Sequence, residues 1–233
     1  MTVFLWGPSE ALIVPAPTPA FLMNNDDSGR CQMFQVGVPE LDIINSLKTF
    51  ADKNKVFVDC GAHMGVYSIL LADGFKQVLA FEAQRRTYLQ LCGNIFLNEK
   101  QNITPYALGI AETTDSRTLY VVSEDGGGST FYLPDVPVLK TETVEIKSLD
   151  DLDISKDNIG LIKLDVEGYE LNIIKGALQT LKQSNYPPIA FESNSGRENY
   201  KTRRSLFKEL QNLNYEIKQF PNFDNMFLAL QVN

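Results

Sequence analysis

Strand-like and helix-like segments alternate along most of this chain, and that alternation restricts the possible folds more than any other feature of the sequence. Short runs rich in β-branched and aromatic residues occupy residues 55–59, 78–82, 103–108, 161–165 and 188–192. Segments with apolar residues at helical spacing follow most of these runs. Because repeated strand–helix units place parallel strands in one sheet, the sequence predicts an α/β fold with helices on both faces of that sheet.

The remaining segments add three smaller features. Residues 113–152 contain alternating strand patterns around three consecutive glycines, which predicts a small β-rich insertion. Two strands at 215–220 and 226–232, separated by a short turn, predict an antiparallel hairpin at one sheet edge. Residues 1–35 are rich in proline and polar residues and are predicted to form an N-terminal arm, which leaves 36–233 as one domain.

The charge balance argues against a nucleic-acid partner. The chain has 233 residues, with 21 Lys and Arg against 29 Asp and Glu, a net charge of −8. Nucleic-acid backbones are bound by clustered basic residues, so no such partner is expected. One stretch, residues 197–218, carries six basic and three acidic residues. A solvated helix face explains it better than a contact to phosphate or to a nucleotide sugar.

The apolar segments and the cysteines indicate the compartment. No apolar run approaches the ~20 residues of a membrane span, and no basic segment of the kind that begins a signal peptide is seen. The three cysteines are odd in number and show no C-x-x-C spacing, which argues against a disulfide framework and against a structural zinc site. We therefore expect a cytoplasmic protein with no membrane span.

Acidic residues end four of the predicted strands: Asp59, Glu82, Asp165 and Glu192. In an open α/β sheet, ligands bind beyond the carboxyl ends of the strands, near the point where the strand order reverses. These four carboxylates are therefore the first candidates for a functional site.

The turn after the first strand has the form D-x-G-x-x-x-G over residues 59–65. Its glycines allow a ligand to approach the backbone above a helix N-terminus. The dinucleotide fingerprint G-x-G-x-x-G needs glycine and a small residue where this chain has His63 and Val66. An acid before the glycines suits a positive group, such as an amino-acid ammonium, better than a pyrophosphate. A plain tight turn is the alternative.

Glu82 ends the second strand 21 positions after Gly61. A carboxylate at that place can accept hydrogen bonds from both hydroxyls of a ribose. Together with Asp59, it fits a nucleoside that carries a positively charged amino acid, which describes S-adenosyl-L-methionine. A surface glutamate at a strand end is the alternative.

A further motif, I-K-L-D-V-E-G at residues 162–168, completes a pattern that resembles a known family. The residues that carry the resemblance appear in the family's order: the glycine turn with Ser68, Phe81-Glu82, Ala107-Leu108-Gly109, Gly128-Ser129, the 162–168 motif and Phe191-Glu192. The chain is similar over about residues 36–232 to FkbM-type methyltransferases that use S-adenosylmethionine. Two positions depart from the family's pattern. Cys60 stands where the family usually has a branched aliphatic residue, and Ala83 stands where proline commonly follows the glutamate.

The resemblance implies a class I O-methyltransferase with a doubly wound, Rossmann-like, seven-stranded sheet whose last strand is antiparallel. It implies a small-molecule or glycan acceptor, namely a hydroxyl of a sugar, a glycan or a glycosylated natural product. The residues that it implies for cofactor binding are Asp59, Gly61, Ala62, His63, Gly65, Ser68 and Glu82, with Ala83 and Ala107 near the adenine.

Methyl transfer to a hydroxyl requires a group that accepts the hydroxyl proton. The single histidine, His63, lies in the glycine turn and fits a cofactor contact or a chance loop residue better than a base. The expected catalytic residues are Asp165, Glu167 and Glu192. Two alternatives stay open for these carboxylates. One is a divalent cation such as Mg²⁺ held by Asp165 and Glu192; the other is a structural ion pair with Lys163 or Lys175.

Other functions are less consistent with the sequence. A short-chain oxidoreductase using NAD needs a Tyr-x-x-x-Lys pair, and no tyrosine here has lysine four positions on. A cofactor-binding module without catalysis stays open. Residues 126–139 and the N-terminal arm are expected to form a lid over the ligand edge.

Overall fold

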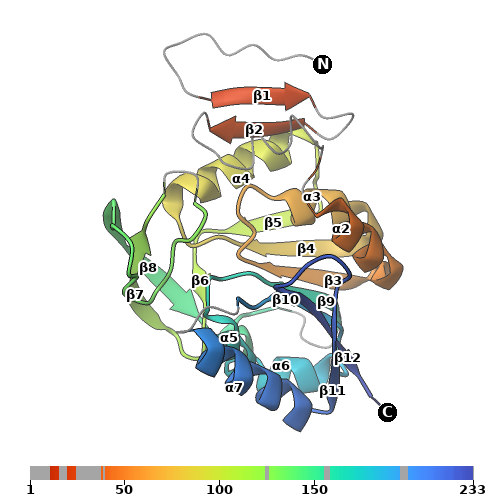
Figure 1. Cartoon of the computed structure of the whole chain (residues 1–233). Helices are drawn as coiled ribbons and strands as arrows, with labels where there is room; N and C mark the ends of the chain where they lie inside the picture. Colours follow the sequence, from red (N-terminus) through yellow and green to blue (C-terminus); the bar gives the residue numbers. More distant parts are fainter. Residues whose placement is uncertain are drawn as a thin grey trace.

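A computed structural model describes residues 11–15, 20–24, 38, 40–123, 126–154, 158–194 and 199–232. Within them, seven strands form one sheet in the order β11-β12-β10-β9-β3-β4-β5 (Figure 1). Their bounds are β3 (Asp52–Cys60), β4 (Phe75–Phe81), β5 (Ile103–Tyr106), β9 (Ile159–Leu164), β10 (Ile189–Glu192), β11 (Tyr215–Gln219) and β12 (Met226–Gln231).

The strand order reverses beside β3, which pairs in parallel with β4 on one side and with β9 on the other. β12, the last strand, runs antiparallel to β10 and β11. The predicted seven-stranded sheet with an antiparallel last strand is therefore confirmed. In register, Cys60 pairs with Phe81 of β4 and with Leu164 of β9, so the chain leaves these three strands at the same edge.

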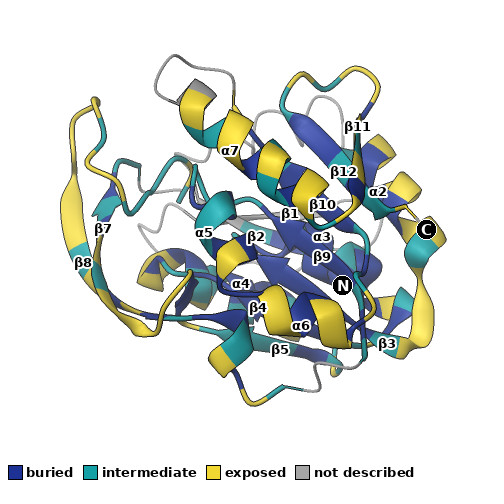
Figure 2. Cartoon of the chain, turned by 90° about the horizontal axis from the view of Figure 1, so that it is seen from below, coloured by how far each residue is buried: buried dark blue, intermediate teal, exposed yellow. Residues whose placement is uncertain are grey.

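Helices cover both faces of the sheet. α2 (Leu41–Leu47), α3 (Val66–Leu71) and α4 (Arg85–Leu97) lie on one face, and α5 (Glu170–Lys175), α6 (Leu178–Gln183) and α7 (Asn199–Asn212) lie on the other (Figure 1). Successive side chains of β3 point to opposite faces of the sheet, since Phe57 packs in one buried apolar cluster and Val58 packs in the other. The outer faces of α6 and α7 are exposed while the strands beneath them are buried (Figure 2).

The predicted β insertion is present as a second, three-stranded sheet. β8 (Lys140–Lys147) lies between β6 (Gly109–Ile110) and β7 (Asp115–Val121). Leu119, Val121 and Val144 form its small apolar core. The third strand, predicted at 103–108, is shorter in the structure. β5 ends at Tyr106, and the chain continues into β6 of the insertion.

The helical pattern at 171–181 forms two short helices, α5 and α6, because Gly176 interrupts it. A Cβ on Gly176 would lie 2.1 Å from the Ala111 carbonyl oxygen, so the chain there packs directly against the backbone of the insertion. Asp150 then caps α6, since its carboxylate accepts hydrogen bonds from Gln179 N (3.0 Å) and Thr180 N (2.7 Å). Contacts between distant segments end the first helix and begin the second.

Part of the predicted N-terminal arm is described, as an antiparallel pair of β1 (Ala11–Pro15) and β2 (Ala20–Asn24). β2 lies against α4, where the Asn98 side chain both donates to and accepts from the backbone of Ala20 (2.7 and 3.0 Å). Phe21 is fully buried in the core. The rest of the arm lies outside the described residues. The described helices include none that is long and apolar enough to cross a membrane.

Candidate active site at the carboxyl ends of β3, β4 and β9

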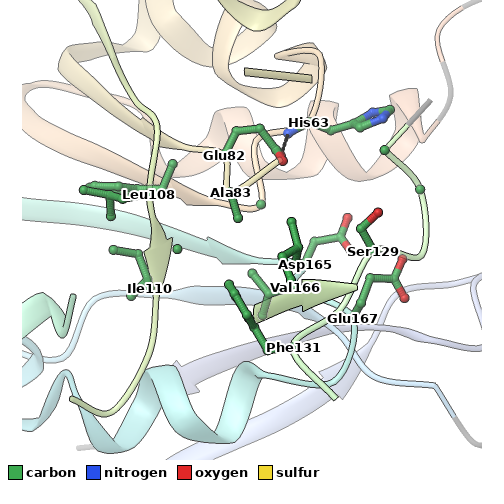
Figure 3. A pocket seen from close by; sticks show the side chains of 16 residues that line it. His63, Glu82, Ala83, Leu108, Ile110, Ser129, Phe131, Asp165, Val166 and Glu167 are labelled. Carbon is green, nitrogen blue, oxygen red and sulfur yellow. Dashed lines mark hydrogen bonds between the residues drawn. The ribbon is translucent and has the colours of Figure 1, made fainter. Parts of the chain in front are cut away.

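A cavity of about 200 Å³ lies where β3, β4 and β9 end. One end is apolar, with Leu108, Ile110 and Phe131, and the other is polar, with Ser129 and Glu167 (Figure 3). The other lining residues are Gly61, His63, Phe81, Glu82, Ala83, Gly109, Leu119, Gly126, Gly127, Asp165 and Val166.

The glycine turn lies against the end of β9, and only glycine fits there. Gly61 has φ +78°, and a Cβ on it would lie 1.8 Å from the Asp165 carbonyl oxygen. The backbone N–H groups of Gly61 and Ala62 both donate to the Phe81 carbonyl, at 3.0 and 2.9 Å. Gly65, with φ +94°, precedes α3. These contacts fix the turn between β4 and β9.

Asp59 is fully buried beneath the turn. Its Oδ2 accepts a hydrogen bond from the Ser68 hydroxyl at 2.6 Å, and its Oδ1 has no hydrogen-bond partner among the described residues. Burial raises the pKa of Asp59, against the opposing effect of the Lys163 ammonium. Four of the residues expected to bind the cofactor, Asp59, Ala62, Gly65 and Ser68, do not line the cavity. They lie in or beneath the turn and support its conformation.

Glu82 occupies the centre of the cavity wall, 8% exposed. Its two carboxylate oxygens accept hydrogen bonds from His63 N (2.9 Å) and Gln84 N (2.8 Å), and Figure 3 draws the first. Burial raises the pKa of Glu82, while these bonds favour its charged form. Each oxygen has a second lone-pair direction, so the carboxylate can accept further hydrogen bonds from a ligand.

The structure places the expected adenine contacts differently at one position. Ala83 lines the cavity as expected, whereas Ala107 is exposed and does not line it. Leu108 and Ile110, which follow Ala107, form the apolar end instead. The prediction for Ala107 is not supported by this geometry because the chain turns after β5 and buries the next residues. Leu108 and Ile110 are functional candidates that the sequence reasoning missed, although their apolar pattern was visible.

A buried ion pair lies behind the polar end. Lys163, 2% exposed, places its Nζ 2.9 Å from Asp165 Oδ2 and 4.5 Å from the centroid of the Tyr67 ring. Burial disfavours the charged form of Asp165, yet the ammonium holds its pKa below the ordinary value. The structural pairing with Lys163 that the sequence left open is present. Lys175 pairs instead with Glu112, at 3.9 Å.

Glu192 hydrogen-bonds Asp165 from the end of β10 and does not line the cavity. Burial, together with the charge of Asp165, raises the pKa of Glu192 to about 9, so Glu192 holds the proton of this pair at neutral pH. Asn225 Nδ2 donates to its Oε1 at 2.6 Å. No group of three or more His, Cys, Asp or Glu side chains suited to a metal ion occurs in the described part of the chain.

Glu167 is, with Asp165, one of two carboxylates of the β9–α5 turn that line the cavity, and the insertion holds it. Its Oε1 accepts a hydrogen bond from Gly128 N (3.0 Å), and its carbonyl accepts one from the Thr130 hydroxyl (3.1 Å). Burial, with the charge of Asp165, raises its pKa. Ser129 donates to Gln84 Oε1 at 2.8 Å, so residues 126–131 of the insertion close the cavity from α4 to the β9–α5 turn.

Comparison with known proteins places this arrangement among methyltransferases. The model of the methyltransferase FkbM domain matches residues 59–227. A protein named Methyltransferase 1 from Beauveria bassiana (strain ARSEF 2860) is 26% identical over 141 residues. That match covers 51% of this chain and 57% of the fungal protein, so it spans a little over half of that relative.

Solved structures share the fold at low identity. Precorrin-6y C5,15-methyltransferase from Geobacter metallireducens GS-15 has a TM-score of 0.53 at 13% identity, covering 85% of this chain and 92% of that one. A Streptococcus mutans protein solved with S-adenosyl-L-homocysteine has a TM-score of 0.54 at 14% identity, covering 82% and 98%. The Pyrococcus abyssi tRNA (uracil-54, C5)-methyltransferase, solved with the same compound, has 0.53 at 14%, covering 96% and 44%.

Proposed function

The chain belongs to the FkbM methyltransferase family, and we propose that it binds S-adenosyl-L-methionine in the cavity and transfers its methyl group to an acceptor hydroxyl. The proposed acceptor is a sugar, a glycan or a glycosylated natural product. The cofactor supplies an electrophilic methyl group on a sulfonium. The protein must bind it, align the acceptor oxygen and accept the hydroxyl proton.

The position of Glu82 is the observation that carries the cofactor assignment. This carboxylate lies in the cavity wall beside Ala83, within reach of both the apolar end and the glycine turn. A purine suits the apolar end, a ribose suits the carboxylate, and the polar turn above Asp59 suits the amino-acid part. Oδ1 of buried Asp59, beneath that turn, has no hydrogen-bond partner among the described residues and leaves an acceptor there. The residues present therefore fit the cofactor.

Glu167 is the best candidate for the base that accepts the hydroxyl proton. It lines the polar end, and its pKa is raised, which makes its carboxylate a better proton acceptor than an exposed one. Asp165 also lines the cavity, but its lowered pKa makes it a weak base. Glu192 holds a proton at neutral pH and lies outside the cavity. In this assignment Asp165 and Glu192 support the site and Glu167 acts in it.

Replacing Glu167 with glutamine should lower the rate of methyl transfer about 100-fold or more, because positioned general bases contribute rate factors of that order. Affinity for S-adenosyl-L-homocysteine should stay within about threefold of the unmodified protein. Initial rates on an acceptor hydroxyl, paired with calorimetric titration of the nucleoside, measure both quantities. The exposed variant Glu216→Gln serves as the matched control. A rate that stays within threefold would contradict the role of Glu167.

A divalent cation held by Asp165 and Glu192 is the alternative way to activate the hydroxyl. The observation in its favour is that the two carboxyls lie within hydrogen-bond contact. A bound cation would displace the shared proton and lower the pKa of a coordinated hydroxyl. Methyl transfer measured after treatment with EDTA, then with added Mg²⁺, separates the alternatives. Full activity with EDTA supports the base, and activity that returns only with Mg²⁺ supports the cation.

The net charge of the chain supports the proposed class of acceptor. A net charge of −8 favours a sugar or other small acceptor over a nucleic acid, although one structural relative, the Pyrococcus abyssi enzyme, methylates tRNA. The proposal is tested with radiolabelled S-adenosylmethionine and a panel of sugars, glycans and glycosides, with tRNA as the comparison. Label on a hydroxyl of a sugar-containing acceptor supports it. Label on tRNA alone would overturn the acceptor class, and no transfer to any acceptor would favour a non-catalytic binding module.

A further inference from the structure

Glu170, the first residue of α5, carries a buried carboxylate to which the proposed transfer assigns no role. The residue is 3% exposed. Its Oε1 accepts hydrogen bonds from the backbone N–H groups of Val166 and Gly168, each at 3.2 Å. Both donors belong to the turn between β9 and α5, which also carries Asp165 and Glu167. The carboxylate therefore holds the backbone of the turn on both sides of Glu167.

The turn needs such an external partner because its backbone is strained. Glu167 has φ +52° and Gly168 has φ +94°. Residues with a side chain rarely adopt positive φ, and the conformation persists only where surrounding contacts fix it. The Thr130 hydroxyl binds the Glu167 carbonyl at 3.1 Å on one side. Glu170 binds the two flanking N–H groups on the other.

We propose that Glu170 is a positioning residue, which holds the turn of residues 166–168 in the conformation that directs the Glu167 carboxylate into the cavity. This inference rests on the proposed function of Glu167. Glu170 does not line that cavity. It borders a separate small space with Glu192 and Arg203, behind the turn. Glu170 therefore affects the reaction indirectly, by fixing the turn and so the position of the Glu167 carboxylate.

Burial, the backbone of the turn and Asp165 set the pKa of Glu170. Burial raises its pKa to about 7, the N–H groups of the turn oppose that rise, and Asp165 adds to it. Glu192 of β10 and Arg203 of α7 face it across the small space, and Tyr132 faces it from the insertion. Arg117 of β7 acts on Tyr132 in turn. The two backbone bonds are therefore strongest above neutral pH, where Glu170 is ionised.

The test measures the turn directly, by NMR hydrogen exchange of the Val166 and Gly168 amides at pH 8. In Glu170→Leu both amides should exchange at least tenfold faster, while amides of β9 keep their rates, because only the turn loses its acceptor. Glu170→Gln retains an oxygen acceptor without the charge, so both amides should exchange faster than in the unmodified protein but more slowly than in Glu170→Leu. Glu170→Asp, one methylene shorter, should resemble the leucine variant and replaces it if that variant fails to fold. Glu216→Gln is the exposed control.

A second readout separates positioning from general stabilisation. The carboxyl carbon of Glu167, titrated by NMR, should show a pKa that falls toward the ordinary value in the leucine and aspartate variants. In Glu170→Gln, which keeps an oxygen acceptor, the pKa of Glu167 should fall less than in Glu170→Leu. Unchanged exchange of the turn amides, or an unchanged titration of Glu167, would overturn the inference. Failure of the unmodified protein to bind S-adenosyl-L-homocysteine would instead overturn the proposed function, because the exchange measurements need no cofactor.

Discussion

Glu82→Ala should weaken the binding of S-adenosyl-L-homocysteine about 100-fold, equivalent to about 2.7 kcal/mol. The carboxylate would accept charge-assisted hydrogen bonds from the ribose hydroxyls, and it already holds His63 N and Gln84 N. Replacing Glu82 with alanine removes the contacts to the ligand. It also removes the acceptor for the backbone N–H groups of His63 and Gln84. Isothermal titration calorimetry of the purified variant measures the change.

Two controls separate these contributions. Glu82→Gln keeps one oxygen acceptor and most of the side-chain shape, so its loss of affinity should be smaller than that of the alanine variant. Glu216→Ala removes an exposed carboxylate from the distant β11 and should leave the affinity unchanged. Affinity for Glu82→Ala within threefold of the unmodified protein would show that this carboxylate does not bind the ribose.

Lys163→Met should lower the free energy of unfolding by about 3 kcal/mol, the lower part of the range for breaking a buried ion pair. Lys163 is 2% exposed and compensates both Asp165 and the fully buried Asp59. The lower part of the range applies because the Asp165 side chain is 33% exposed and is partly screened by water. Urea denaturation at pH 7, followed by circular dichroism, measures the change.

The pH dependence and a double variant test the cause of this loss. Without the ammonium, the folded-state pKa of Asp59, which burial already raises, should rise further, and that of Asp165 should rise above its unfolded value. The contribution of these two carboxyls to stability would then be greatest below their unfolded pKa values and would be lost as pH rises through the folded values. Lys163→Met combined with Asp165→Asn should recover part of the loss at pH 7, because one unpaired charge is gone. A single variant that loses less than about 1 kcal/mol would indicate that water, not Lys163, solvates these carboxylates.

The acidic strand ends made much of the site predictable from sequence. Asp59, Glu82 and Asp165 end neighbouring parallel strands, so periodicity alone brings them to one edge of the sheet. The glycine spacing after Asp59 is likewise local, since the positive φ of Gly61 requires that residue type. Glu192 ends the next strand, but the structure separates it from the cavity and joins it to Asp165.

Contacts between segments distant in sequence were not predictable in the same way. Whether Ala107 or Leu108 faces the cavity depends on how the chain turns from β5 into the insertion. The hydrogen bond from Gly128 N to the Glu167 carboxylate joins residues that are 39 positions apart in the sequence. The break between α5 and α6 depends on Gly176 meeting the backbone at Ala111. No local propensity encodes these three contacts, because tertiary packing decides each of them.

The most direct test of the methyltransferase assignment is a calorimetric titration of the purified protein with S-adenosyl-L-methionine, S-adenosyl-L-homocysteine and NAD⁺. The cofactor decides the reaction class before any acceptor is identified. We predict micromolar binding of both sulfur nucleosides and no measurable binding of NAD⁺. Binding of NAD⁺ alone, or of none of the three, would contradict the proposal that this cavity serves methyl transfer.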